Sequence, residues 1–122
     1  MSEDLRAAGH ELRSAFQLVV TTVGRLPELE RLLASIRSQT ATGIHVVVVD
    51  QSGGDEVEAL CSRYEPELTL THVRSEAGAS SGRNAGIRQI EARPDGHRIV
   101  AFPDDDCWYS PTLLADVGRL LQ

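Results

Sequence analysis

Lysine is absent from this 122-residue chain, and all 12 of its basic residues are arginines. The absence excludes chemistry that needs a lysine side chain, such as Schiff-base formation and the phosphate contacts of P-loop and kinase lysines. It also counts against a phosphorelay receiver, an α/β class that combines clustered aspartates with a lysine. Any phosphate group bound here must therefore be held by arginine, by backbone N–H groups or by a metal ion.

Cysteines and long apolar runs are also scarce. Cys61 and Cys107 are too few for a disulfide framework or a zinc site, so a reducing cytoplasm is the expected location. No apolar run approaches the roughly 18 residues of a transmembrane helix. Residues 1–14 are charged and lack the core of a signal peptide. We expect 1–14 to be a leader that precedes a single domain at 15–122.

Positive charge is in deficit, because 18 acidic residues face 12 basic ones and the net charge is −6. This balance argues against a nucleic-acid-binding surface. The contents of 41% hydrophobic and 25% charged residues are typical of a globular domain. The four histidines are scattered and show no metal-ligand spacing. The chain is therefore expected to be one compact domain with no bound nucleic acid.

Four short segments have the composition of β-strands, and they span 16–22, 44–49, 68–73 and 99–102. The second contains four successive valines, which is typical of a central parallel strand buried on both faces. We expect 68–73 to lie nearer an edge of the sheet and 99–102 to be buried.

The intervening segments predict amphipathic helices, because apolar residues recur at i, i+3, i+4 and i+7. Pro27 opens the first helix, and Ser110 with Pro111 should begin the last. The third should run from near Ser80 or Ser81 to about Ala92, before a turn at 94–96. The apolar stripes of the first, second and last helices are Leu29, Leu32, Leu33 and Ile36; Val57, Leu60, Cys61 and Tyr64; and Leu113, Leu114, Val117, Leu120 and Leu121.

Strands and helices thus alternate along the chain as β-α-β-α-β-α-β-α. Alternation of this kind implies a parallel sheet with right-handed crossovers and helices on both faces. The predicted fold class is α/β, a Rossmann-like αβα sandwich with a mainly parallel sheet.

Three aspartates, Asp104, Asp105 and Asp106, follow the fourth strand directly. Two carboxylates about 5 Å apart repel each other by roughly 3 kcal/mol at an effective dielectric constant near 20, so a cation is expected beside them. In an extended segment Asp104 and Asp106 point to one side and Asp105 to the other. The spacing suits a hard divalent cation such as Mg²⁺ or Mn²⁺. A solvated acidic turn explains the motif alone equally well.

Ligands of open parallel sheets bind outside the carboxyl ends of the strands. Thr21 and Thr22 lie at the end of the first strand, Asp50 ends the second and the aspartates follow the fourth. The loop 78–84 leads into a helix start, where a phosphate could bind backbone N–H groups. All these polar features should line one edge of the sheet. That coincidence favours a ligand site over an acidic turn.

Each of these residues also has a simpler structural explanation. Asp50 could serve simply to accept hydrogen bonds from its own turn. Gly78 and Gly82 could simply be turn residues without a ligand role. Arg83 could pair with one of the acids, which is compatible with binding a phosphate. Trp108 and Tyr109 are expected in the core or an interface.

Taken together, the motifs resemble those of family 2 glycosyltransferases of the GT-A fold, in their N-terminal nucleotide-sugar-binding half. The matching segments are Leu18–Arg25, Val47–Asp50 with the Ser-Gly turn after it, Gly78–Gly86 and Phe102–Asp106. The resemblance runs from about residue 16 to residue 122, and the order and spacing of the segments are more specific than any one of them.

The resemblance implies a site for a nucleotide-diphosphate sugar, whose sugar is transferred to a hydroxyl group of a saccharide or another acceptor. A divalent cation, Mn²⁺ or Mg²⁺, would bind Asp104 and Asp106 of the family's DXD element and neutralise the leaving diphosphate. The loop after the first strand would line the base pocket, Asp50 would bind the base edge and Arg83 the base or diphosphate. The implied nucleotide-sugar-binding residues are Thr21, Thr22, Arg25, Asp50, Gln51, Gly78, Arg83, Asn84, Asp104 and Asp105.

The chain departs from the family's pattern in three places. Val23 and Gly24 stand where an aromatic residue and an asparagine are common, and Gln51 stands where a second acid is common. The family's catalytic base lies beyond the DXD element, and no candidate for it is present. We therefore expect a fragment or a truncated protein that binds the donor weakly and transfers sugar poorly or not at all. The resemblance also implies an inverting enzyme.

Two other functions remain open from the sequence. One is a metal-dependent nucleotidyltransferase, although the glycine-rich basic loop that usually follows its first strand is missing. The other is a non-catalytic αβα binding module. An apolar face left exposed on the last helix would also allow the chain to form an oligomer.

Overall fold

The structure, a computed structural model, describes residues 16–91 and 99–121. Its four strands are β1 (Phe16–Thr22), β2 (Ile44–Asp50), β3 (Thr69–Arg74) and β4 (Ile99–Ala101). They form one all-parallel sheet in the order β3-β2-β1-β4. The predicted α/β class with a parallel sheet is confirmed. The predicted leader at 1–14 and the turn at 94–96 lie outside the described residues.

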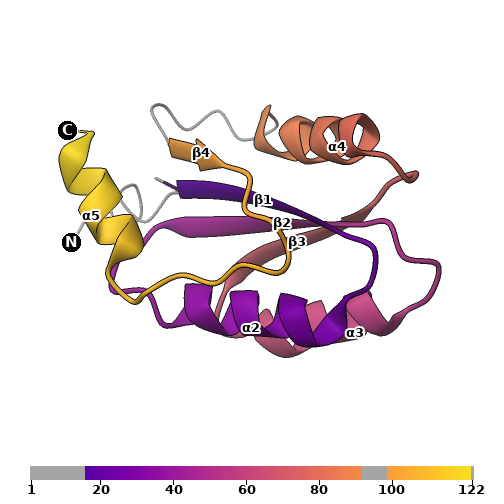
Figure 1. Cartoon of the computed structure of the whole chain (residues 1–122), viewed down its shortest axis with the longest axis horizontal. Helices are drawn as coiled ribbons and strands as arrows, with labels where there is room; N and C mark the ends of the chain where they lie inside the picture. The colour runs from indigo at the N-terminus through magenta and orange to yellow at the C-terminus, as the bar shows by residue number, and fades with distance from the viewer. Residues whose placement is uncertain (1–15, 92–98, 122) are drawn as a thin grey trace.

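The helices form a layer on each face of the sheet (Figure 1). Helices α2 (Leu26–Arg37) and α3 (Glu56–Tyr64) cover one face, and α4 (Ala79–Glu91) covers the other. Helix α5 (Leu113–Leu120) lies beside the amino ends of the strands. The carboxyl ends of the strands, with the loops that follow them, are left at the opposite end of the molecule.

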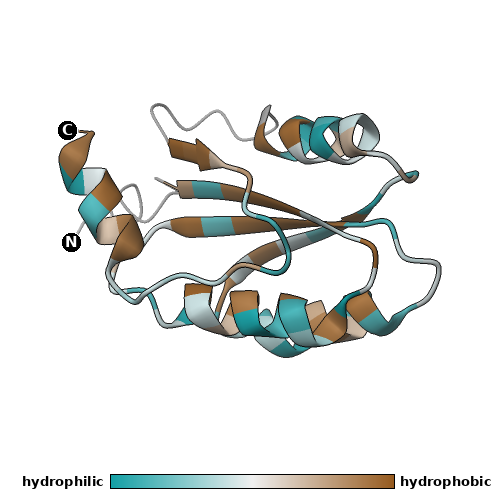
Figure 2. Cartoon of the chain, in the orientation of Figure 1, coloured by the Kyte–Doolittle hydropathy of each residue, from teal (hydrophilic) through white to brown (hydrophobic). Residues whose placement is uncertain are grey.

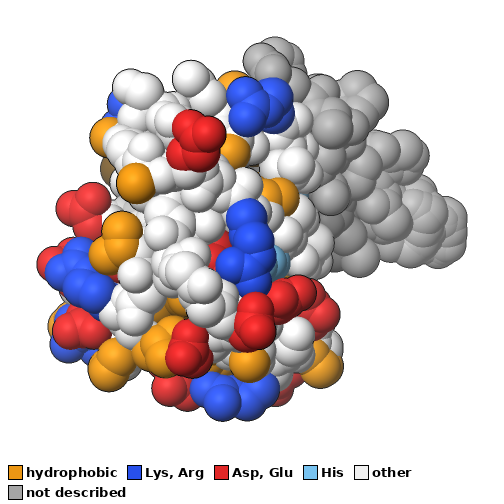
Figure 3. Space-filling view, turned by 90° about the vertical axis from the view of Figure 1, so that its right-hand side faces the viewer, with side chains coloured by type: hydrophobic (Ala, Val, Ile, Leu, Met, Phe, Trp, Pro, Cys, Tyr) orange, Lys and Arg blue, Asp and Glu red, His pale blue; other side chains and the backbone are white. Residues whose placement is uncertain are grey.

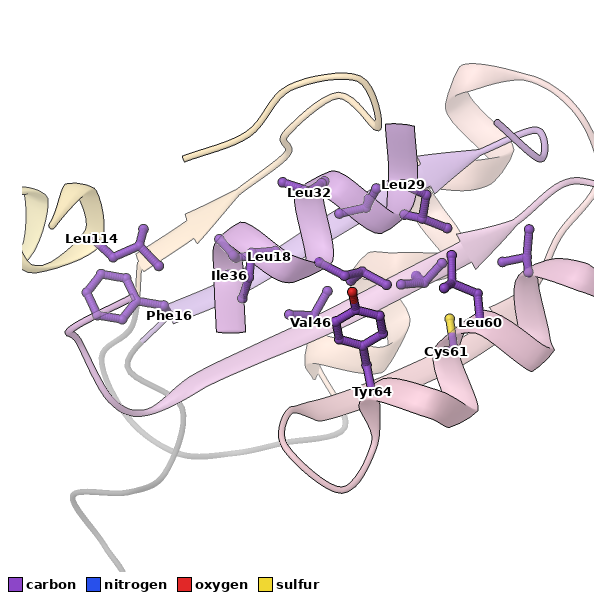
Figure 4. Close-up of a cluster of buried hydrophobic side chains, with 14 residues drawn as sticks. Phe16, Leu18, Leu29, Leu32, Ile36, Val46, Leu60, Cys61, Tyr64 and Leu114 are labelled. Carbon is purple, nitrogen blue, oxygen red and sulfur yellow. The ribbon is translucent and has the colours of Figure 1, made fainter. Parts of the chain in front are cut away.

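The larger core lies between the sheet and helices α2 and α3, where the predicted stripes of both helices are buried (Figure 4). Figure 2 shows the same division, with apolar positions of the helices turned to the sheet and polar ones outward. A fully buried leucine, such as Leu18, Leu29 or Leu32, contributes about 1.5–3 kcal/mol. The periodicity of the sequence therefore placed these two helices correctly.

The smaller core lies between the sheet and α4. Val19, Val47 and Val49 pack there against Ala85 and Ile90 of the helix. The helix approaches β1 closely at Gly86, where an added Cβ would lie 2.3 Å from Cγ1 of Val19. Helix α4 is thereby fixed with its first turn at the carboxyl edge of the sheet.

The fourth strand was predicted to span 99–102 and to be buried, and both predictions are wrong. β4 has three residues rather than four, and Val100 and Phe102 are 42% and 43% exposed. The reason is the sheet order, which makes β4 an edge strand beside β1 alone among the described strands. β3 is the other edge strand, as predicted.

The last helix begins at Leu113, with Thr112 as its N-cap, and not at Ser110. The carbonyl oxygens of Ser110 and Pro111 instead accept hydrogen bonds from Gln39 Nε2 (2.7 Å) and the Thr40 N–H (2.9 Å). Of its predicted apolar stripe only Leu114 is buried, whereas Leu120 is 82% exposed. No helix in the described part of the chain is both long and apolar enough to span a membrane.

Candidate functional site

The polar ends of three strands meet at the carboxyl edge of the sheet. Thr22 of β1 lies beside Asp50 of β2 in the sheet register. The Thr22 hydroxyl donates a 2.9 Å hydrogen bond to Asp105, which follows β4. Figure 3 faces this end of the molecule and shows acidic and basic side chains interspersed across it. The residues predicted from three separate strands therefore do share one rim.

A hollow of about 180 Å³ opens at this edge between β1, α4 and the segment after β4. Three of the predicted residues, Thr21, Arg83 and Asp104, line it together with Phe102. The Arg83 guanidinium lies over the Phe102 ring, 5.4 Å from its centroid, and forms no ion pair with any described carboxylate. An unpaired guanidinium beside the first turn of a helix suits an anionic group such as a phosphate.

Asp105 is turned inward, 4% exposed, and is held by two residues of β1 and the loop after it. Its Oδ2 accepts from Thr22 Oγ1 and, at 3.4 Å, from Arg25 Nε, while its Oδ1 accepts from Arg25 Nη2. The hydrogen bond and the charge of Asp105 raise the pKa of Arg25. Arg25 is therefore the cation that offsets the repulsion between the adjacent aspartates.

Asp104 and Asp106 are exposed on either side of this buried residue. Asp106 Oδ2 lies 3.7 Å from Arg25 Nη1. No group of three potential metal ligands occurs among the described residues. Two exposed carboxylates still fit a cation that takes its other ligands from phosphate and water, as Mg²⁺ commonly does. Cys107 next to them is a soft ligand, and burial with the neighbouring Asp104 and Asp106 raises its pKa, so it does not add to such a site.

Asp50 has no exposed side-chain surface. Its Oδ1 accepts from the N–H and hydroxyl of Ser52 at 2.9 and 2.5 Å, and its Oδ2 from His72 Nε2 at 2.7 Å. Burial alone would raise the pKa of Asp50, but the hydrogen bonds from Ser52 and His72 outweigh it and lower the pKa. In this structure Asp50 holds its own turn, and a contact with a nucleobase stays a prediction.

Gln51 joins the end of β2 to the loop before α4. Its Nε2 donates to the carbonyl oxygens of Glu76 (2.7 Å) and Gly78 (2.8 Å). Gly78 has φ +116°, which favours glycine. A Cβ at Gly82 would lie 2.8 Å from Gln51 Nε2 and 2.9 Å from the Thr21 side chain. Gly78 therefore allows the turn before α4, and Gly82 in the first turn of α4 allows the helix to approach the sheet closely.

Asn84 is separated from the hollow that Arg83 lines. It borders a second hollow of about 350 Å³, on another side of α4. The residues around that second hollow are Arg74, Ser75, Glu76, Ser81, Asn84 and Arg88. Consecutive helical residues point about 100° apart, so Arg83 and Asn84 cannot serve the same hollow directly.

Two residues at this edge carry roles that the sequence analysis missed. Phe102 supports Arg83, although it was assigned to a buried strand, and its position beside the acids was the available signal. His72 forms a hydrogen bond with Asp50, although from the sequence the histidines were described only as scattered and without metal-ligand spacing. The sequence feature that could have revealed this role is the alternation of β3, which puts Leu70, His72 and Arg74 on one side of the strand. That Asp50 is the partner of His72 follows only from the β2–β3 register.

Comparison with known proteins adds independent evidence. Residues 17–122 match the model of a family described as glycosyl transferase family 2. An uncharacterized glycosyltransferase of Bacillus subtilis (strain 168), YwdF, is 29% identical over 105 residues, which are 86% of this chain and 37% of that protein. The succinoglycan biosynthesis protein ExoW of Rhizobium meliloti (strain 1021) is 35% identical over 92 residues, 70% of this chain and 27% of that protein. The chain thus spans about a third of the length of these relatives.

Solved structures show the same fold. A mannosyltransferase from Pyrobaculum calidifontis, in complex with GDP-Man and Mn²⁺, superposes with a TM-score of 0.74 at 26% identity, over 89% of this chain and 32% of that one. TarS of S. aureus in complex with UDP-GlcNAc superposes with a TM-score of 0.74 at 24% identity, over 87% of this chain and 30% of that one.

Proposed function

This chain belongs to glycosyl transferase family 2 and has the GT-A fold, and on that basis we propose that it binds a nucleotide-diphosphate sugar as the donor half of such an enzyme. The sugar would pass to a hydroxyl group of a saccharide or another acceptor. A nucleotidyltransferase is not favoured, because the matched family and the relatives are glycosyltransferases.

The observation that carries this proposal is the hollow where Arg83 and Asp104 face the same space. The guanidinium of Arg83 would donate paired hydrogen bonds to a phosphate of the donor, a geometry that arginine suits better than lysine. Phe102 would hold that guanidinium in place through cation–π attraction. Asp104 would accept a hydrogen bond from the ribose or contribute to the metal site.

Asp104 and Asp106 are the residues that would hold a divalent cation, Mn²⁺ or Mg²⁺. When bound, the cation would neutralise charge on the departing diphosphate. The Mn²⁺ complex of the related mannosyltransferase supports a divalent cation here. The exposed carboxylates, held apart by the buried Asp105, supply a partial ligand set that phosphate oxygens would complete.

We further propose direct displacement with inversion at the anomeric carbon, which needs a base at the acceptor hydroxyl. The four aspartates described at this edge, Asp50, Asp104, Asp105 and Asp106, serve the donor side or hold the loops, so none of them is assigned as that base. The 122-residue chain should therefore bind the donor and transfer sugar slowly or not at all.

The test is a thermal melt of the chain with UDP, GDP or dTDP, with and without Mn²⁺. A ligand at ten times its Kd stabilises the folded state by about 1.4 kcal/mol, so the melting temperature should rise by several degrees with one nucleotide plus Mn²⁺. Arg83→Gln and Asp106→Asn should abolish most of the shift. Asp116→Asn, which changes an exposed aspartate paired with Arg119 on α5, is the matched control. No shift with any nucleotide would contradict the proposal and favour a non-catalytic module.

A further inference from the structure

The loop after β1 and the acidic segment are joined by three side chains, Thr22, Arg25 and Asp105, which we call the Asp105 cluster. Resting on the donor-binding function above, we propose that Asp105 is a positioning residue. It would hold the loop after β1 and the exposed aspartates in the one arrangement that binds both ends of the donor. The resemblance implied direct contact of all three residues with the nucleotide sugar, and this proposal reassigns the two buried ones, Thr22 and Asp105.

Burial separates Thr22 and Asp105 from any ligand, whereas the third member of the cluster, Arg25, keeps 49% of its side chain exposed. Asp105 is 4% exposed and Thr22 is 1% exposed, so neither side chain has surface for a bound nucleotide. Both oxygens of Asp105 already accept hydrogen bonds from the protein. A carboxylate that is buried and satisfied in this way acts on a ligand through its neighbours.

On the acidic side, the cluster determines which aspartates face outward. Asp105 lies in a turn closed by a 3.2 Å hydrogen bond from the Cys107 N–H to the Asp104 carbonyl oxygen. Because Asp105 is anchored inward, Asp104 faces the hollow and Asp106 faces solvent. Arg31 supports the same turn through a 3.1 Å hydrogen bond from Nη2 to the Asp106 carbonyl oxygen. The directions of the two proposed metal ligands therefore depend on the residue between them.

On the other side, the cluster fixes the bend after β1. The Thr22 hydroxyl donates to Asp105 and accepts a 3.1 Å hydrogen bond from the Gly24 N–H. Gly24 has φ +111°, a conformation that other residues rarely adopt. One hydroxyl group thus links the bend at Gly24 to the acidic turn. If this loop contacts the nucleobase, base recognition and metal binding share a single support.

This connection predicts a specific energetic signature. A nucleoside diphosphate that meets the loop with its base and the metal with its phosphates needs both ends in register. Without metal, the phosphate end contributes less, so the support matters less. Outer-shell partners of metal ligands typically change metal affinity about 10–100-fold when removed. Loss of the cluster should therefore reduce the gain in nucleotide affinity that Mn²⁺ provides.

The experiment measures the Kd of the most tightly bound of UDP, GDP and dTDP by calorimetry, with and without Mn²⁺. Thr22→Val removes the hydroxyl without changing size or charge, and Thr22→Ser restores it. Asp105→Asn removes the charge that pairs with Arg25. Asp116→Asn again controls for loss of an ion-paired aspartate elsewhere. Circular dichroism establishes that each variant is folded, and the two Thr22 variants suffice if Asp105→Asn does not fold.

The proposal predicts that the ratio of the metal-free Kd to the Kd with Mn²⁺ falls about tenfold or more in Thr22→Val and Asp105→Asn. The ratio should recover in Thr22→Ser and stay unchanged in Asp116→Asn. An unchanged ratio in Thr22→Val, or equal weakening with and without Mn²⁺, would overturn the proposal. If the unaltered chain binds none of the three nucleotides, the proposed function itself fails and this inference falls with it.

Discussion

At the scale of single residues, the site depends on carboxylates with different surroundings. Asp50 and Asp105 are buried and satisfied by hydrogen bonds, whereas Asp104 and Asp106 are exposed. The sequence presents all four as similar acids at strand ends. Which aspartates hold the loops and which are free to bind a ligand is decided by their hydrogen-bond partners, which lie up to 83 residues away along the chain.

The lowered pKa of Asp50 predicts how stability changes with pH. The unfolded state, with a pKa near 3.9, binds the proton more readily than the folded state. The stabilising contribution of Asp50 is therefore present above about pH 4 and lost as the pH falls through the lower folded pKa. Asp50→Asn should reduce the free energy of unfolding at pH 7 by about 1.5–3 kcal/mol, because hydrogen bonds to a charged group are lost.

The measurement is urea unfolding of the unaltered chain and Asp50→Asn from pH 7 to pH 3. The variant should also lose less stability than the unaltered chain as the pH falls below about 4. Asp55→Asn is the control in the same turn, because the Asp55 side chain is 95% exposed, and it should change little. Parallel pH profiles for the unaltered chain and Asp50→Asn would refute the role given to Asp50.

Residue roles were only partly predictable from sequence. The position of Asp50 at the end of β2 was predicted correctly, because an acid directly after a valine run marks a strand end, whereas its predicted contact with the base stays a prediction. The Arg25–Asp105 pair was not, since it depends on the bend at Gly24 and on an inward turn at Asp105. From the sequence, Arg83 was a possible partner for the acids, but its guanidinium lies over the Phe102 ring, and Arg25 pairs with Asp105 instead.

At the scale of elements, α4 carries Arg83 and must pack closely to bring it to the hollow. The helix is close to β1 because Gly86 has no side chain, and an added Cβ would lie 2.3 Å from Val19 Cγ1. Val19 is itself 2% exposed, so it has little space into which to move. The position of the Arg83 guanidinium thus depends on a residue one turn further along the helix.

Gly86→Ala should therefore destabilise the fold by about 1–3 kcal/mol through overpacking, although alanine favours helix by about 1 kcal/mol. Gly118→Ala in α5 is the matched control, because its Cβ would meet Phe16 Cζ at an ordinary 3.4 Å. That variant should be neutral or slightly more stable. Urea unfolding measures both, and a Gly86→Ala variant more stable than the unaltered chain would contradict this packing.

Elements with a strong periodic signal were predicted well, and those that depend on neighbours were not. β1 matches the predicted 16–22, and α2 and α3 bury the predicted stripes. β4 has an apolar sequence that suits a buried strand, yet it lies at an edge, because strand order is not encoded in one strand's composition. The start of α5 was displaced by contacts from Gln39 and Thr40, which no local pattern near Ser110 reveals.

At the scale of the whole molecule, the sheet order brings distant segments together at one end. The loops after β1 and β4 and the start of α4 meet there because β1 lies between β2 and β4. Helix α5, which ends at the exposed Leu120 and is followed by the exposed Leu121, lies at the opposite end of the sheet. An oligomer formed through α5 stays a prediction, and it would leave the donor edge free.

The central claim is that a metal-bound nucleoside diphosphate occupies the edge formed by Asp104, Asp106 and Arg83. Paramagnetic broadening by Mn²⁺ of backbone amide NMR signals, in the presence of the bound nucleotide, measures this directly, with Mg²⁺ as the diamagnetic reference. We expect the strongest broadening at residues 104–107, followed by 21–25 and 79–83, with weaker broadening around Asp55, Glu56 and Glu58 and sharp signals in α5, at the opposite end of the sheet. Broadening centred on residues 55–58, with sharp signals at 104–107, would contradict the account.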